Sequence, residues 1–140
     1  MEPAVAAKAA ALRTFLLTKV APDIDNATTV RDAVAAEVAA YAEFSAQLAK
    51  LPAGPLHTLV DLGENVLCSA VVDDTSRVFL HCGLGFHPQL SRSDAAKLAA
   101  ARIALLQGRL ALREKELATL QTKAELLRQG LAQLVKLHGA

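Results

Sequence analysis

The side chains best suited to hold a metal ion lie close together in the middle of the chain. They are His57, Cys68, His81, Cys82 and His87. A zinc site would need thiols or imidazoles paired at short spacing, such as Cys-x-x-Cys or His-x-x-x-His, and neither pattern is present. His81 and Cys82 are adjacent, and neighbouring residues of a strand point to opposite faces. We therefore predict no metal site, and we expect both thiols to be reduced and to act as small apolar side chains.

The same stretch contains fragments of catalytic motifs, none of them complete. Gly83-Leu84-Gly85 lacks the third glycine and the strand–helix context of a dinucleotide loop, so a hairpin turn is the better interpretation. Ser69 and Ser76 stand in no nucleophile-elbow pattern, and the Asp73-Asp74 pair is typical of a turn. The sequence therefore predicts that the protein is not an enzyme, with no catalytic residues and no cofactor.

Residues 55–90 form the segment that must position these side chains, and they are the only part without a helical pattern. The segment is rich in Val, Leu, Phe and Thr and is punctuated by turn residues at short intervals, which is typical of short strands joined by tight turns. Turns are expected at Gly63-Glu64, at residues 73–76 and at residues 83–85. We predict a module of two β-hairpins with four strands, at about Leu56–Leu62, Asn65–Val72, Arg77–Cys82 and Phe86–Leu90.

The predicted strands are apolar on both faces. In the second strand Val66, Cys68, Ala70 and Val72 alternate with Leu67 and Val71, so neither face is polar. A strand of this kind needs cover on both sides, and four short strands also leave open edges. Two helical arms cannot supply that cover, so we expect another subunit to do so. The residues expected to carry subunit assembly are Val60, Leu62, Val66, Val71, Val78, Leu80 and Phe86.

A long helix is expected after the module. Ser91 and Asp94 form a capping-box-like start, and from there apolar residues recur at alternating steps of four and three to about residue 137. That spacing indicates a coiled-coil seam, in which Arg113 is the single polar member. Its positions are Ala99, Ile103, Leu106, Leu110, Arg113, Leu117, Leu120, Ala124, Leu127, Leu131 and Leu134.

A second helical arm precedes the module. Residues 1–20 are alanine-rich, Pro22 interrupts the helix, and a fresh start with Pro22 in the first turn is the simplest interpretation. The same four–three rhythm then runs from Ile24 to Leu48. We predict an α+β, mostly α fold in one domain over residues 1–140. In it, an N-terminal arm (1–51) and a C-terminal arm (91–138) pair as an antiparallel coiled coil joined by the strand module (56–90).

Charge and hydropathy exclude several classes of function. The formal net charge is +1, so no overall field favours nucleic acid or an anionic membrane. Basic residues of the C-terminal arm are spaced along the helix and do not form the dense block of a basic-zipper protein. Neither a signal peptide nor a membrane span is evident, so a cytoplasmic and nuclear protein is expected.

The module also carries a family resemblance. Val60-Asp61-Leu62-Gly63, Val71-Val72, Asp74 to Val78 and Gly83 to Phe86 resemble the α-class subunits of the prefoldin family, and within it the UXT type of prefoldin-like subunit. The resemblance implies an ATP-independent, heterohexameric co-chaperone that assembles through β-hairpins. Implied partners are β-class prefoldin subunits, a second α-class (URI-like) subunit and the R2TP co-chaperone, with no direct contact to nucleic acid or membrane.

The same resemblance implies that unfolded or unassembled client proteins are held at the ends of the arms. The residues expected to contact clients there are Leu12, Phe15, Leu16, Leu131, Leu134 and Val135. An alternative from another class is a coiled-coil transcriptional cofactor that binds one regulator directly. The two-faced apolar strands argue against that alternative, because an isolated adaptor would expose them.

Overall fold

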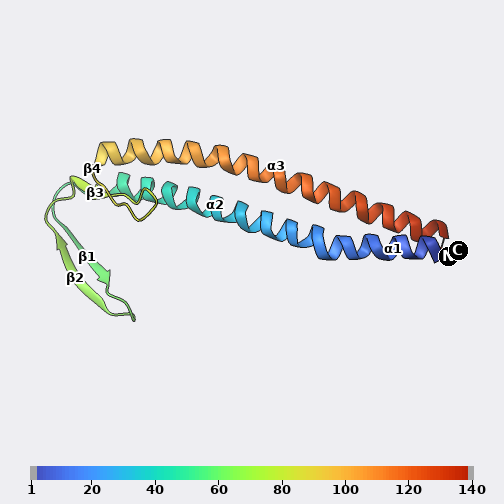
Figure 1. The fold of residues 1–140 in the computed structure, drawn as a ribbon. Helices are drawn as coiled ribbons and strands as arrows, with labels where there is room; N and C mark the ends of the chain where they lie inside the picture. The colour runs from blue at the N-terminus through green and yellow to red at the C-terminus, as the bar shows by residue number, and fades with distance from the viewer. Residues whose placement is uncertain (1–2, 139–140) are drawn as a thin grey trace. The chain divides into compact units, whose positions relative to one another are not determined.

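The computed structural model describes residues 3–138, which are mostly helical and include two small antiparallel sheets (Figure 1). The chain divides into two compact units. An arm unit comprises the residues up to Glu37 together with those from Leu106 onward, and a hairpin unit comprises Val38–Leu105. The expectation of a single domain stays a prediction. None of the described helices is long and apolar enough to cross a membrane.

The N-terminal arm is helical from Pro3 to Lys50 and contains one π-helical turn. Helix α1 (Pro3–Phe15) leads into a π-helical turn, η1 (Leu16–Val20), and then into α2 (Ala21–Lys50). The backbone N–H of Ala21 donates to the carbonyl of Leu16, five residues back. Pro22 has no N–H to donate and its ring crowds the carbonyl four residues earlier, so a wider turn accommodates it. As predicted, Pro22 lies in the first turn of a new helix.

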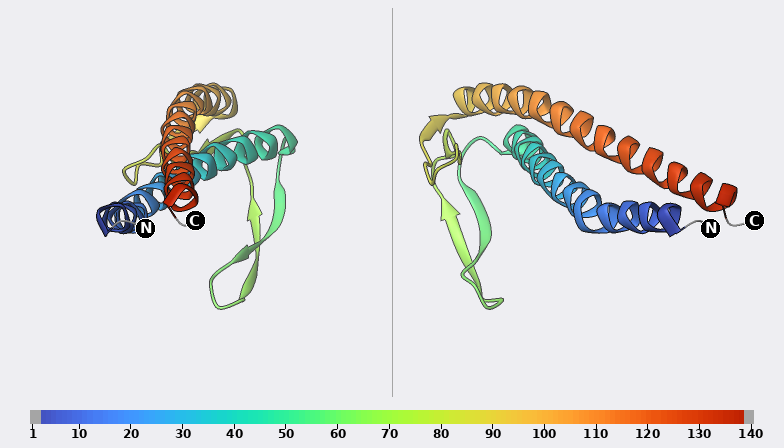
Figure 2. Two further views of the ribbon diagram at one scale, coloured as in Figure 1. Left: turned by 90° about the vertical axis from the view of Figure 1, so that its right-hand side faces the viewer. Right: turned by 45° about the vertical axis from the view of Figure 1, so that its right-hand side comes forward.

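The C-terminal arm is a single helix, α3 (Arg92–His138). Its first turn is capped as predicted, because the Ser91 hydroxyl accepts the Asp94 N–H at 3.1 Å and donates to the Asp94 carboxylate at 2.8 Å. At 1.5 Å per residue the helix is roughly 70 Å long. Both ends of the chain lie in the arm unit, where α1 runs beside the last turns of α3 (Figures 1 and 2).

Burial along the arms follows the predicted four–three pattern. Every predicted seam position of α3 is buried or half-buried except Arg113. The Arg113 guanidinium instead reaches the surface and pairs with Glu116 at 2.8 Å, as a snorkelling side chain does. The most buried apolar residues of the arm unit are Val20, Leu106, Leu117 and Ala124, and those of the hairpin unit are Tyr41, Leu48, Leu80, Ala95 and Ala99.

The strand module consists of two hairpins, as predicted. Strand β1 (Leu56–Asp61) pairs with β2 (Leu67–Val72), and β3 (Arg77–Phe79) pairs with β4 (Gln89–Ser91), all antiparallel. The first pair lies close to its predicted position. The predicted third strand is too long, and the predicted fourth strand, Phe86–Leu90, begins too early. Pro88 cannot donate to the ladder, and beyond Phe79 the strands are joined only by isolated backbone hydrogen bonds, such as Leu80 N–H to the Pro88 carbonyl at 3.3 Å.

Candidate functional site

The second hairpin, β3–β4, is fixed to helix α2 within the hairpin unit. Leu80, which directly follows β3, is only 4% exposed. Next to it, the Tyr41 hydroxyl donates to the His81 carbonyl at 2.8 Å, and Tyr41 is itself buried. An apolar side chain and a hydrogen bond therefore attach this hairpin to the middle of the unit.

The segments around the hairpins are tied by two further side chains. The Thr75 hydroxyl is buried and donates to the Pro52 carbonyl at 2.8 Å. The Arg92 guanidinium, in the first turn of α3, donates to the carbonyls of Leu48 at 3.2 Å and of Leu51. Leu48 lies in the last turn of α2, and Leu51 directly follows the helix. Carbonyls at a helix C-terminus lack partners within the helix and carry partial negative charge, so a cation is stabilising there.

The first hairpin, β1–β2, has no comparable cover. Nearly every residue of both strands is exposed, and the views in Figure 2 show neither of the helix segments of the hairpin unit lying on a face of this hairpin. The register places Thr58 opposite Ala70 and Val60 opposite Cys68 on one face, which is apolar apart from Thr58. Leu59 and Leu67, on the other face, are 64% and 61% exposed. The rest of that face is mixed, with Val71 beside His57, Ser69 and Asp61. The prediction of strands that are apolar on both faces is therefore correct for one face and only partly correct for the other.

The tips of the two hairpins share one backbone design. In the first, Leu62 N–H donates to the Val66 carbonyl and Val66 N–H to the Gly63 carbonyl, and in the second, Cys82, Phe86 and Gly83 make the same pair of bonds. All three residues within each loop have positive φ. The first loop is Gly63-Glu64-Asn65 and the second is Gly83-Leu84-Gly85, in which Leu84 is 97% exposed.

The predicted assembly residues differ in burial. Most of them have exposed side chains, whereas Val78 is half-buried and Leu80 is buried in the subunit's own core. Their role in assembly stays a prediction. Sequence reasoning did not select the exposed residues Leu59, Leu67, Phe79 and Leu84. The exposure of Leu84 could have been predicted from the sequence, because a leucine between two glycines in a tight turn has no core to pack against. The exposed predicted residues are Val60, Leu62, Val66, Val71 and Phe86.

The connection between the hairpins is a polar turn with a perturbed acid. The backbone N–H and the hydroxyl of Ser76 each donate to the Asp74 carboxylate at 2.8 Å. These two bonds, with the Arg77 cation nearby, hold the pKa of Asp74 below its ordinary value. The hydrogen bonds keep this turn closed between β2 and β3.

The candidate metal ligands are only partly brought together. The His81 and His87 rings lie 4.8 Å apart between their centroids. Among the residues that the structure describes, no group of three or more His, Cys, Asp or Glu side chains is placed to hold a metal ion. Cys68 is a free, exposed thiol and Cys82 a free, half-buried one.

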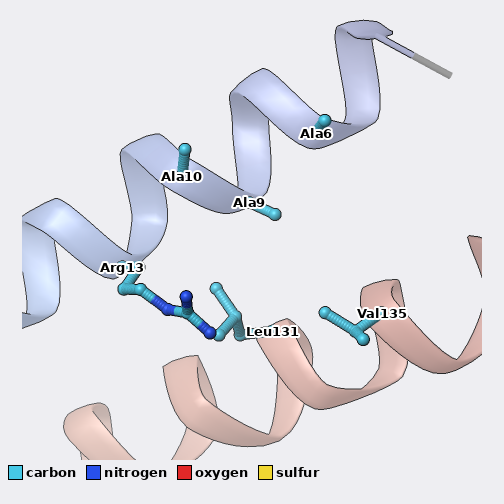
Figure 3. A pocket seen from close by; sticks show the side chains of 6 residues that line it. All are labelled: Ala6, Ala9, Ala10, Arg13, Leu131 and Val135. Carbon is cyan, nitrogen blue, oxygen red and sulfur yellow. The ribbon is translucent and has the colours of Figure 1, made fainter. Parts of the chain in front are cut away.

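Within the arm unit, a half-open and largely apolar cavity of about 220 Å³ lies between α1 and α3. Of the predicted client-contact residues, Leu131 and Val135 line it, whereas Leu12, Phe15, Leu16 and Leu134 do not. Phe15 is 49% exposed, and the other three are half-buried. The α1 side of the cavity is lined by Ala6, Ala9, Ala10 and Arg13. Figure 3 shows the side chains of Ala9 and Arg13 pointing toward the α3 side of the cavity.

Comparison with known proteins was made for the whole chain. The model of the prefoldin subunit family matches residues 21–137. A UXT homolog from Nematostella vectensis is 28% identical over 129 residues, covering 89% of this chain and 81% of the relative. Human UXT is 27% identical over 124 residues, covering 86% and 79%. A cryo-EM structure of filamentous PFD from Methanocaldococcus jannaschii has a TM-score of 0.62 at 20% identity, covering 82% of this chain and 97% of that one, which shows a common fold.

Proposed function

Since the chain belongs to the prefoldin subunit family, we propose that it is a subunit of a heterohexameric prefoldin-like co-chaperone. The observation that carries this proposal is the β1–β2 hairpin, one face of which is apolar apart from Thr58, and whose strands are exposed along nearly their whole length. Large exposed apolar surfaces mark interaction sites. A two-stranded sheet is also marginal by itself and gains stability when further strands or helices cover it.

In this proposal the two arms form an antiparallel coiled coil. Support comes from the burial of the four–three positions, including Leu106 and Leu117 on α3 and Tyr41 and Leu48 on α2. The proposed coiled coil spaces the client-holding ends away from the hairpins, and holding requires no ATP. The absence of a catalytic arrangement in the sequence motifs fits a binding function of this kind.

The similarity to UXT proteins favours a particular assembly. The proposed partners are β-class prefoldin subunits and a second, URI-like α-class subunit, and the proposed wider context is the R2TP co-chaperone. Both the cytoplasm and the nucleus are proposed as its locations. Client contact is proposed at the arm ends, through exposed or half-buried apolar side chains such as Phe15, Leu131 and Val135.

The experiment that tests assembly is co-expression of the tagged chain with β-class subunits and the second α-class subunit, followed by native mass spectrometry. A species of hexameric mass with this chain inside it is expected. Val71→Asp introduces a charge on the exposed apolar hairpin and should abolish that species, because an unpaired charge buried in the interface costs several kcal/mol (about 3–5). Leu80 is unsuitable for this test, since it is buried in the subunit itself.

Ser93→Asp is the matched control, because Ser93 is exposed in the first turn of α3, where a carboxylate is favourable. It adds the same charge and should leave the hexamer intact. A hexamer that persists with Val71→Asp would contradict the proposed interface. Recovery of the wild-type chain with a single transcription regulator and no prefoldin subunit would contradict the co-chaperone and favour the adaptor.

A further inference from the structure

The two arm ends have an unusual charge pattern. Residues 1–22 and 126–140 contain five Lys or Arg and a single acidic residue, Glu2, which lies outside the described residues, although the formal net charge of the whole chain is only +1. Acidic residues resume at Asp23 on the first arm and at Glu125 on the second. The end of the arm unit is therefore a cationic surface. Its five basic residues are Lys8, Arg13, Lys19, Arg128 and Lys136.

This surface contains the cavity between α1 and α3. Three alanines on the α1 side leave a half-open space of about 220 Å³, which Leu131 and Val135 line from α3 (Figure 3). A cavity of about 150 Å³ lined by apolar residues is known to accept benzene. The space is therefore large enough for one leucine, isoleucine or phenylalanine side chain supplied by another molecule.

Arg13 is the one charged residue that lines the cavity. Its guanidinium extends from α1 toward Leu131 at the edge of the space (Figure 3), and its side chain is exposed. Within residues 3–138 it makes no ion pair, whereas Arg31, Arg113 and Arg128 each have an acidic neighbour. An unpaired guanidinium can bind a carboxylate through two parallel hydrogen bonds.

We propose that the arm ends select acidic peptide segments with a bulky apolar side chain, which enters the cavity while a flanking carboxylate binds Arg13. This inference rests on the client-holding function proposed above and names the class of client segment. Lys8, Lys19 and Lys136 add attraction for negative charge, whereas Arg128 already has Glu125 beside it. That attraction should be strongest at low ionic strength.

The test uses the assembled complex and fluorescent peptides in an anisotropy titration. One probe is a Gly/Ser peptide with a central Glu-Leu-Glu, and the matched probe replaces both glutamates with lysine. The Glu-flanked peptide should bind at least about tenfold more tightly, with the difference shrinking as salt is added. A third probe, with serine in place of the leucine, should bind more weakly than the Glu-flanked leucine peptide.

Two variants separate the charge from the cavity. Arg13→Glu should reduce affinity for the Glu-flanked peptide about tenfold, whereas Lys123→Glu makes the same charge change at an exposed position that does not line the cavity and should have little effect. Ala9→Leu adds side-chain volume at the cavity and should therefore weaken binding of both leucine peptides. Leucine is a good helix former, so this variant should leave α1 intact.

Three results would contradict the inference. Equal affinity for the Glu-flanked and Lys-flanked probes would exclude selection of acidic segments, and equal effects of Arg13→Glu and Lys123→Glu would exclude a role for Arg13 beyond net charge. If no probe binds while the complex still prevents aggregation of a denatured protein, the cavity inference fails and client holding stands. If the complex prevents no aggregation either, the holding function fails with it.

Discussion

The two hairpins of the module have the same loop backbone and opposite surroundings. In both, a three-residue loop with positive φ is closed by the same pair of backbone hydrogen bonds. β3–β4 is joined to the rest of its unit through buried Leu80 and the hydrogen bond from Tyr41 to the His81 carbonyl. β1–β2 leaves the side chains of nearly all its residues exposed.

The difference shows that a hairpin's local design does not decide whether it is part of a core. Both hairpins carry apolar residues in their strands and glycines in their turns, but only the second has neighbours that half-bury one of its faces. We infer that the second hairpin is stabilised within the subunit, and that the first depends on partners for its stability. Substitutions in the two hairpins should therefore act on different properties, and the following predictions run from the largest expected effect to the smallest.

The largest effect on stability is expected for Leu80→Ala. This substitution leaves a cavity where the second hairpin meets the core of its unit, and Leu→Ala changes in cores cost about 2–5 kcal/mol. Leu59→Ala is the matched change in the first hairpin, where the side chain is 64% exposed, and it should cost no more than about 0.5 kcal/mol. Urea unfolding of the two purified variants measures both values. Equal losses would contradict the asymmetry between the hairpins.

A smaller effect is expected for Tyr41→Phe. The variant keeps the ring in place and removes the hydrogen bond to the His81 carbonyl, so about 0.5–1.5 kcal/mol of the free energy of unfolding should be lost. Thr58→Val removes a hydroxyl from the exposed first hairpin and serves as the comparison, with no measurable loss expected. Thermal melts followed by circular dichroism compare the two, and an unchanged Tyr41→Phe melt would show that this bond does not attach the hairpin.

The first glycine of each hairpin loop gives a sharper comparison of the two hairpins, because the two glycines have the same backbone conformation. Gly63 and Gly83 both have φ +98°, and a Cβ on either would meet no atom within 4 Å. Alanine should therefore cost only backbone strain, about 1 kcal/mol in each case. In Gly83→Ala this strain should lower the melting temperature of the chain. In Gly63→Ala it should appear as faster amide hydrogen exchange confined to β1–β2, since a loosely attached hairpin opens locally.

If Gly63→Ala lowered the melting temperature of the chain as much as Gly83→Ala does, the first hairpin would also be coupled to the helices, which would contradict the comparison.

The smallest effect concerns the turn between the hairpins. The pKa of Asp74 is lower in the folded state than in the unfolded chain, so its contribution to stability is fully present above the unfolded pKa and is lost as the pH falls through the folded pKa. An NMR titration of the Asp74 carboxyl measures the shift. Ser76→Ala removes one of the two donors and should move the pKa back toward its ordinary value, without reaching it, because the Ser76 N–H remains.

Much of the fold could be predicted because periodicity and capping are local properties of sequence. The Ser91–Asp94 cap, the seam of α3 and the two-hairpin module all follow from spacings within a few residues. The match of the prefoldin family model and the similarity to UXT proteins confirm the resemblance that was drawn from the module.

The remaining features depend on contacts between distant residues. Nothing near Leu80 in the sequence distinguishes it from Val71, yet Leu80 is buried and Val71 is 53% exposed. The Tyr41 bond spans 40 residues and the Arg92 bonds more than 40. The cavity at the arm ends was missed for a related reason, since alanine contributes to a binding site by the space that it leaves, and composition alone treats it only as a helix former.

The π-helical turn η1 also sets which side of the first arm is buried. Leu12, Leu16, Val20 and Ile24 follow one another at steps of four, and all are half-buried or buried. In an unbroken α-helix each residue turns the chain by about 100°, so successive steps of four would rotate this stripe off its face. The π-helical turn contains more residues than an α-helical turn and so compensates for this rotation, as a stutter does in a coiled coil. Removing a single residue there would therefore rotate everything before it by about 100°, and the alanines and Arg13 would no longer share a face with the seam that follows.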